Sequence, residues 1–160
     1  MTEKSPLFTI NEIIKILPHR FPFILVDRVI GVTVPDTNTK IGRKVTAIKN
    51  VTINEPYFPG HFPHRPVMPG VLQIETMAQV AAREVVDLNG PRMDTAIAGI
   101  DKARFRKPVI PGDQLVITAE ILKDRSQIFV VRCEAHVDGV LVSEVELIAK
   151  VYPIEAAAGN

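Results

Sequence analysis

Two residues that can move protons lie close together in the chain, a histidine in a proline-rich segment and a glutamate further on. His61 stands in the segment Gly60-His61-Phe62-Pro63, and Glu75 follows 14 residues later. Imidazole is the side chain whose ordinary pKa suits proton transfer near neutral pH. A carboxyl group in apolar surroundings has a raised pKa, as a general acid needs. The pair therefore favours acid–base chemistry, with the histidine as base and the carboxyl group as acid.

A third element of this chemistry is the start of a predicted helix over residues 71–87. Free N–H groups in a first helical turn stabilise negative charge on a substrate oxygen. Gly70 precedes that turn and has no side chain, so a substrate can come close to the N–H groups of Gly70 and Val71. A base, an acid and an oxyanion donor together predict proton abstraction next to an activated carbonyl, with a protonated leaving group.

Other chemistries find little support in the residues. The single cysteine, Cys133, excludes an intrachain disulfide and a Cys/His zinc spacing. The chain has no G-x-G-x-x-G, P-loop or G-x-S-x-G motif. Each candidate also has an ordinary structural interpretation. A loop histidine often only bonds a nearby backbone group, and Glu75 could lie at the edge of the helix face beside an arginine. His19, His64 and His136 carry that ordinary interpretation too.

The composition is that of a globular domain, and we expect residues 1–160 to form one, with flexible first residues and a flexible end at 155–160. Apolar residues make up 46% of the chain and the net charge is +1, which argues against disorder and against a nucleic-acid-binding surface. No apolar run is long enough to span a membrane, and we expect a cytoplasmic protein. Five of the 13 prolines fall within residues 56–69, which predicts a rigid, non-helical segment there.

The hydrophobic periodicity predicts elements that would position these groups. We expect a short helix over 10–17, strands over 23–34 and 40–49, an ordered loop over 54–70, the long helix over 71–87, and strands over 95–106, 114–123, 129–137 and 141–151. Asp138-Gly139 is a strong hairpin signal. Without β-α-β alternation, this order favours an α+β fold, an antiparallel sheet packed on one long helix.

A helical wheel places Glu75 inside the apolar face of that helix, with Gln79 beside it one turn on. The face is formed by seven small or branched apolar residues, Val71, Ile74, Ala78, Ala81, Ala82, Val85 and Val86. Thr76 is expected to lie off the face, together with Arg83, Glu84 and Asp87. A carboxylate among apolar side chains is costly unless it is paired, hydrogen-bonded or neutral.

Four motifs in order resemble those of the 3-hydroxyacyl-[acyl-carrier-protein] dehydratases of the FabZ type. They span residues 17–29 (LPHRFPFILVDRV), residues 58–63 (FPGHFP) continued by residues 65–72 (RPVMPGVL), residues 75–79 (ETMAQ) and residues 101–113 (DKARFRKPVIPGD). The resemblance implies a hotdog fold, a sheet wrapped around a central helix. It also implies dehydration of (3R)-hydroxyacyl thioesters to trans-2-enoyl thioesters in fatty-acid elongation, without any cofactor.

In that resemblance His61 and Glu75 match the catalytic pair, which the family draws from two subunits of a dimer, and three dimers commonly form a hexamer. The related dehydratase-isomerases carry aspartate at the helix position, so Glu75 favours dehydration without isomerisation. The same fold also hosts thioesterases and non-catalytic acyl-thioester binders, which remain alternatives.

Four cations fall within six residues, Lys102, Arg104, Arg106 and Lys107. In a chain of net charge +1 they form a local patch. One interpretation is a docking site for an acidic acyl carrier protein, with Arg104 and Arg106 on one side of a strand. The other is a solvated strand face.

Overall fold

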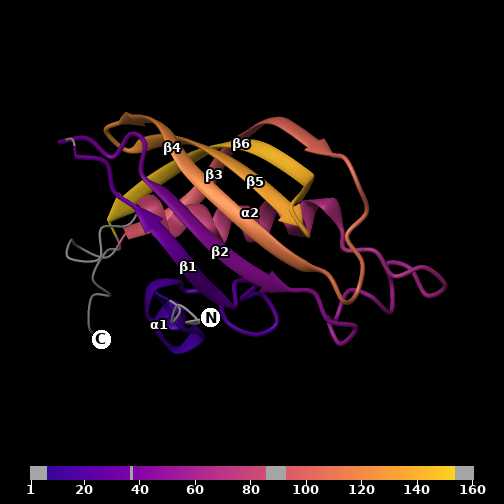
Figure 1. Cartoon of the computed structure of the whole chain (residues 1–160). Coiled ribbons are helices and arrows are strands. Elements are labelled where there is room, and N and C mark those ends of the chain that lie inside the picture. Colours follow the sequence, from indigo (N-terminus) through magenta and orange to yellow (C-terminus); the bar gives the residue numbers. More distant parts are fainter. Residues whose placement is uncertain (1–6, 37, 86–92, 154–160) are drawn as a thin grey trace, which may run out of the picture.

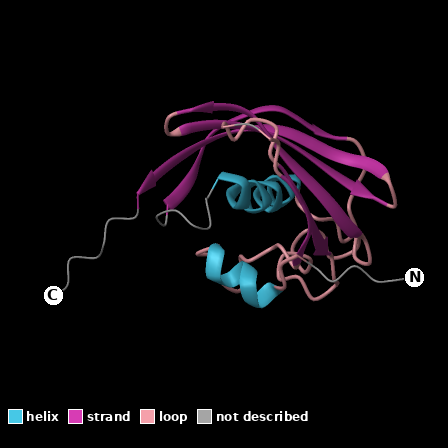
Figure 2. Ribbon diagram, turned by 60° about the vertical axis from the view of Figure 1, so that its left-hand side comes forward, coloured by secondary structure: helices cyan, strands magenta, loops and turns pink. Residues whose placement is uncertain are grey.

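One curved antiparallel sheet surrounds a long helix in the computed structural model, which describes residues 7–36, 38–85 and 93–153. The strands lie in the order β1-β2-β4-β5-β6-β3. Their bounds are Arg28–Thr33 for β1, Lys44–Asn50 for β2, Met93–Phe105 for β3, Gln114–Arg125 for β4, Ile128–Val137 for β5 and Val140–Pro153 for β6. Helix α2 (Gly70–Val85) lies in the hollow of the sheet, and α1 (Ile10–Ile16) lies on the open side of α2 (Figures 1 and 2). The predicted α+β architecture is confirmed.

The second half of the sheet follows the period-two pattern of the sequence. Leu115, Ile117, Ala119 and Ile121 of β4 point inward and are fully buried, and the alternate residues of β5 and β6 join them in the core. Asp138 and Gly139 both have positive φ angles, 49° and 77°, between β5 and β6. Two consecutive positive φ angles form the turn that suits the twist of a hairpin. The hairpin prediction is therefore confirmed.

Helix α2 is covered on a wider arc than the wheel predicted. Met77, Val80 and Ala81 are buried, as are the polar Gln73 and Gln79. The expectation that Thr76 lies off the buried face is wrong. Its side chain is fully buried, and its hydroxyl donates to the Leu72 carbonyl oxygen at 2.7 Å, which satisfies the polar group inside the core.

The predicted apolar face is not buried at its first residue. Val71 was placed on that face, but it is 72% exposed at the first turn of the helix. The side chains of residues 83–86 lie outside the described part of the structure, as do Asp87 and the helix-stop signal at 89–91.

Two predicted strands are shorter in the structure, one because its first residues bond to α2 and the other because the chain turns before it. The segment before β1 runs past α2, where the Leu25 N–H donates to Gln79 Oε1 at 2.9 Å and the Phe23 carbonyl accepts from Gln79 Nε2 at 2.8 Å. These backbone groups are satisfied by the helix and need no neighbouring strand. Before β2 the chain turns at Gly42, whose φ of 82° suits glycine.

Strand β3 forms one edge of the sheet and pairs with β6 alone among the described strands. Its register shifts at two places, between Ile97 and Gly99 and between Asp101 and Arg104. Ile97, Ile100 and Phe105 are large apolar residues on this strand that remain exposed. The edge therefore combines unpaired backbone groups with apolar side chains, as an association surface does. No described helix is long and apolar enough to cross a membrane.

The buried cysteine gives a test of this packing. Cys133 has no exposed surface, its Sγ lies 3.8 Å from the Met77 carbonyl oxygen, and burial raises the pKa of its thiol. Because only the thiolate reacts, we expect native protein to react with Ellman's reagent about a hundredfold or more slower than unfolded protein. The absorbance of the released thiolate measures both rates. Rapid reaction of the native chain would contradict the packing of β5 against α2.

Candidate active site

The proline-rich segment holds the backbone of His61 from both sides. The His61 N–H donates to the Tyr57 carbonyl oxygen at 3.0 Å, and the His61 carbonyl accepts from the Val67 N–H at 3.0 Å. The Met68 N–H then donates to the Val109 carbonyl at 2.8 Å and ties the segment to the loop after β3. These bonds, with the fixed φ angles of the prolines, set the path of the chain around His61.

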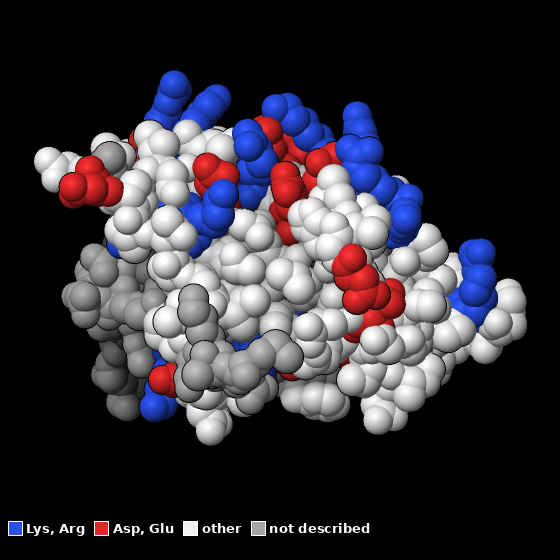
Figure 3. Space-filling model, viewed as in Figure 1, with Lys and Arg blue, Asp and Glu red and all other residues white. Residues whose placement is uncertain are grey.

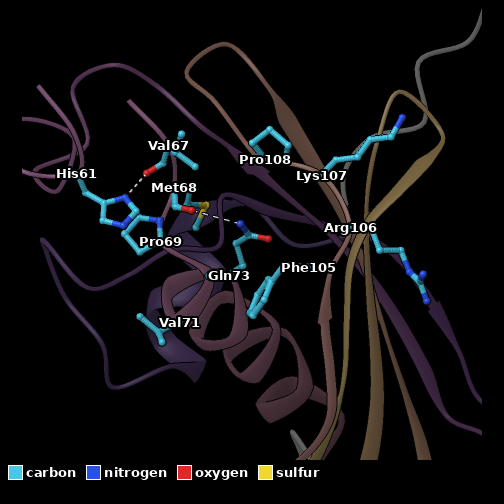
Figure 4. A pocket seen from close by; sticks show the side chains of 11 residues that line it. His61, Val67, Met68, Pro69, Val71, Gln73, Phe105, Arg106, Lys107 and Pro108 are labelled. Atoms are coloured by element: carbon cyan, nitrogen blue, oxygen red, sulfur yellow. Dashed lines mark hydrogen bonds between the residues drawn. The ribbon is translucent and has the colours of Figure 1, made fainter. Parts of the chain in front are cut away.

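The side chain of His61 is held in one tautomer. Its Nδ1 lies 2.7 Å from the Val67 carbonyl oxygen, which can only accept, so Nδ1 carries the proton (Figure 4). The ring also stacks on Phe62, with centroids 4.1 Å apart. In the neutral ring the lone pair is therefore on Nε2, which is the form that a general base requires. The backbone-bonding interpretation and the catalytic interpretation of this histidine are compatible.

His61 lines a cavity of about 570 Å³ together with the start of α2 (Figure 4). The Leu72 and Gln73 N–H groups both donate to the Pro69 carbonyl, at 3.0 and 3.1 Å. The N–H groups of Gly70 and Val71 precede them, at the end of the helix where the helix itself supplies no acceptor. A Cβ on Gly70 would lie 2.8 Å from the Phe105 ring, so only glycine fits there without displacement.

Glu75 lies in a second cavity, of about 240 Å³, with mostly apolar walls. The walls come from α2, β3 and β6: Ala78, Gln79, Ala81, Ala82, Thr95, Ile97, Leu147 and Ala149, with His19 beside Glu75. Two nitrogens contact the carboxyl group. Gln79 Nε2 donates to Glu75 Oε1 at 2.9 Å, and His19 Nε2 lies 3.3 Å from the same oxygen. The expected neighbour Gln79 is present, and among the described residues the other nitrogen beside Glu75 belongs to His19 rather than to an arginine.

The two cavities have no lining residue in common among the described side chains. Within one chain the structure does not bring His61 and Glu75 into one cavity. The helix explains the separation, because Gly70, Val71 and Gln73 at its start line the first cavity, whereas Glu75, Ala78, Gln79 and Ala82 follow the i, i+3, i+4, i+7 pattern of another face.

The four cations near the end of β3 have different surroundings. Lys102 pairs with Glu146 at 2.8 Å, and Arg106 pairs with Glu144. Arg104 donates to the Ala103 carbonyl at 2.9 Å, and Lys107 lines the His61 cavity with Arg106. Figure 3 shows Lys and Arg side chains over the sheet side of the molecule with acidic groups among them. The register shift before Arg104 and the end of β3 at Phe105 interrupt the simple alternation predicted for Arg104 and Arg106.

The sequence matches a known domain over most of its length. A model of the FabA-like domain matches residues 17–146. The chain belongs to the FabA-like family. Among the described residues, no group of three or more His, Cys, Asp or Glu side chains could hold a metal ion.

Within this family the chain is similar to several dehydratases. It is 49% identical over 150 residues to the 3-hydroxyacyl-[acyl-carrier-protein] dehydratase FabZ of Nitrosospira multiformis, covering 91% of this chain and 98% of that protein. It is 46% identical over 154 residues to the FabZ of Myxococcus xanthus, covering 94% and 96%. The predicted resemblance to FabZ-type dehydratases is confirmed.

Solved structures agree on the fold at low sequence identity. The fluoroacetyl-CoA thioesterase FlK gives a TM-score of 0.63 at 17% identity, over 74% of this chain and 92% of that chain. The dehydratase heterocomplex ApeI:P from Xenorhabdus doucetiae gives 0.54 at 19%, over 77% and 95%. These likenesses support the hotdog fold.

The sequence analysis predicted His61, Glu75 and Gly70 as site residues. It assigned His19 only an ordinary structural role, although this histidine stands in the first of the four motifs.

The contact between Gly70 and Phe105 yields a stability prediction. In Gly70→Ala the new methyl group displaces the Phe105 ring, and overpacking of this kind costs about 1–3 kcal/mol, against which the alanine gains up to about 1 kcal/mol of helix propensity. We expect Gly70→Ala to lower the free energy of unfolding measured in urea. In a Phe105→Ala background, the further cost of Gly70→Ala should be smaller by about 1 kcal/mol.

Gly60→Ala is the matched control, because its nearest foreign atom, the Tyr57 carbonyl oxygen, would lie 3.9 Å from the new Cβ. A cost of Gly70→Ala that is independent of Phe105 would contradict the proposed clash.

Proposed function

We infer that the protein is a 3-hydroxyacyl-[acyl-carrier-protein] dehydratase of fatty-acid elongation. The observation that carries this conclusion is the near-50% identity to FabZ dehydratases over more than nine-tenths of the chain. The reaction removes water from a (3R)-hydroxyacyl thioester to give a trans-2-enoyl thioester. A C–H and a C–O bond break, a C=C bond forms, and no electrons pass to another molecule, so the proposed reaction needs no cofactor.

We propose that His61 is the base. Its Nδ1 proton is held by the Val67 carbonyl, so Nε2 is free to take the proton from C2 of the substrate. The N–H groups of Gly70 and Val71 would stabilise the negative charge that develops on the thioester oxygen. Both features lie in the same cavity, which supports a single binding position for the thioester.

We propose that Glu75 is the acid that protonates the departing C3 hydroxyl group. The carboxyl group lies in a cavity whose walls, from α2, β3 and β6, are mostly apolar. Gln79 holds one carboxyl oxygen, which fixes the orientation of the group.

The proposed site is completed by a second copy of the chain. His61 and Glu75 line separate cavities in one chain, and the edge strand β3 carries exposed apolar residues beside unpaired backbone groups. A dimer formed through this edge would cover both features. Grouping of three dimers into a hexamer stays a prediction from the family resemblance.

We propose that the substrate arrives on an acidic acyl carrier protein, and that the reaction takes place in the cytoplasm. Of the four cations near β3, Lys102 and Arg106 have carboxylate partners. Arg104 and Lys107 pair with no carboxylate among the described side chains, which favours these two for docking. Thioester hydrolysis is the competing function, and its product, a free thiol, is distinguished from the conjugated enoyl thioester by absorbance.

The catalytic pair can be tested by mixing two variants. His61→Ala and Glu75→Gln should each lower turnover by about 10²–10⁴-fold, because each loses one proton-transfer group. If every site uses His61 of one chain and Glu75 of another, chains combined at random in an equimolar refolded mixture recover about a quarter of wild-type activity. The absorbance of the enoyl thioester measures the rate.

Wild-type protein refolded in the same way, and each variant refolded alone, are the controls. A mixture as inactive as its parents would contradict a site shared between chains, and a fully active single variant would remove that residue from the mechanism.

Carrier-protein docking gives a separate prediction. Reversing the charge of both Arg104 and Lys107 to glutamate should raise KM for carrier-bound substrate about fivefold, at roughly 0.5 kcal/mol for each exposed charge. KM for a short thioester without the carrier should rise less, because of the two residues only Lys107 also lines the His61 cavity. Lys123→Glu, an exposed reversal on β4, is the control. Equal effects on both substrates would show that the patch does not recognise the carrier protein.

A further inference from the structure

His19 approaches the proposed acid from outside the helix and has no part in the reaction described above. It precedes the extended segment that runs past α2, and its Nε2 lies 3.3 Å from Glu75 Oε1. Gln79 Nε2 donates to the same oxygen at 2.9 Å. Oε1 therefore has two nitrogen neighbours, whereas the described side chains supply no partner for Oε2.

The surroundings of the His19 ring indicate where its proton lies. Nδ1 is buried and has no hydrogen-bond partner within the described part of the chain. A proton on that atom would be a buried donor without an acceptor, which is costly. The neutral tautomer with the proton on Nε2 avoids this cost and places an N–H group toward the carboxyl oxygen.

Two contacts hold the ring in this position. It stacks against Phe23, with centroids 6.3 Å apart and planes 24° apart. The Phe23 carbonyl in turn accepts from Gln79, the amide that also holds Glu75. The contacts form a closed circuit through His19, Phe23, Gln79 and Glu75, so the imidazole and the carboxyl group are fixed relative to each other.

We propose that His19 is a positioning residue for Glu75. Its Nε2–H and the Gln79 amide both occupy Oε1 as donors, so the acid proton resides on Oε2 and is directed toward the substrate hydroxyl. This inference rests on the proposed function.

The other groups around the cavity leave this arrangement undisturbed. The guanidinium of Arg20 donates to the Leu17 and His19 carbonyls at 2.9 and 2.7 Å, and the cavity-lining residues of β3 and β6 carry no charge.

Three substitutions separate the N–H donor from the packing of the ring. His19→Phe keeps an aromatic ring against Phe23 but removes the donor. His19→Gln loses the ring but keeps an N–H, because its Nε2 stands the same number of bonds from the backbone as the histidine Nε2. His19→Asn carries its amide nitrogen one bond too short to reach Glu75.

Steady-state dehydration of a 3-hydroxyacyl thioester, followed by absorbance, gives kcat and KM for each variant. We expect His19→Phe and His19→Asn to lower kcat about tenfold or more, because a general acid contributes about 10²–10⁴-fold and a misdirected proton loses part of it. His19→Gln should stay within about threefold of wild type, and KM should change less than about twofold in all three, since the lost interaction acts in the chemical step.

The ring rather than the donor would be responsible if His19→Gln lost as much kcat as His19→Phe, and that result overturns the proposal. Full activity in all three variants, or a raised KM at unchanged kcat, overturns it as well. Should His19→Phe fail to fold in a thermal melt, the comparison of asparagine with glutamine decides the same question.

Glu75→Gln in the same assay separates this inference from the proposed function. An inactive Glu75→Gln with a fully active His19→Phe overturns the role of His19 alone. An active Glu75→Gln overturns the role of Glu75 in the proposed function, and this inference with it.

Discussion

The buried amide of Gln79 is the interaction on which the rest of the site depends. It is 2% exposed, and it accepts from the Leu25 N–H while donating to the Phe23 carbonyl and to Glu75. A buried amide that loses a partner costs about 1–3 kcal/mol, so these bonds strongly favour one arrangement. One side chain thereby attaches the segment before β1 to helix α2 and orients the carboxyl group. The packing of the fold and the geometry of the proposed acid have the same origin.

The proposed base is positioned by a different device. His61 lies in a segment with little regular secondary structure, and its position follows from local backbone hydrogen bonds and from the attachment of Met68 to the loop after β3. The two proposed catalytic groups are thus fixed independently, one by a rigid loop and one by a side-chain network on a buried helix. Their separation within a chain is a consequence of the helix geometry, which directs Gly70, Val71 and Gln73 to one cavity and the face that carries Glu75 and Gln79 to another.

Much of the fold was predictable because local signals and tertiary packing agree in it. The alternation in β4 to β6 and the Asp138-Gly139 turn both describe local geometry that the chain adopts. The predictions failed where a distant group decides. The strand predicted from residue 23 begins later because the Phe23 and Leu25 backbone groups bond to Gln79, which a strand pattern cannot reveal. Thr76 was misplaced because a helical wheel assumes one buried face, whereas the curved sheet covers more. The contact of His19 with Glu75 was missed because it joins two elements far apart in sequence.

Because the chain is synthesised from its N-terminal side, β3 is made before the strand with which it pairs. Strand β3 pairs with β6, yet two other strands, β4 and β5, are synthesised between them. Until β6 emerges from the ribosome, β3 has no described partner in its own chain, and its exposed apolar residues face solvent or other chains. Nascent segments of this kind are prone to aggregation. Strand β6 therefore closes both the sheet and the apolar cavity beside Glu75, so neither exists before residues 140–153 have been translated.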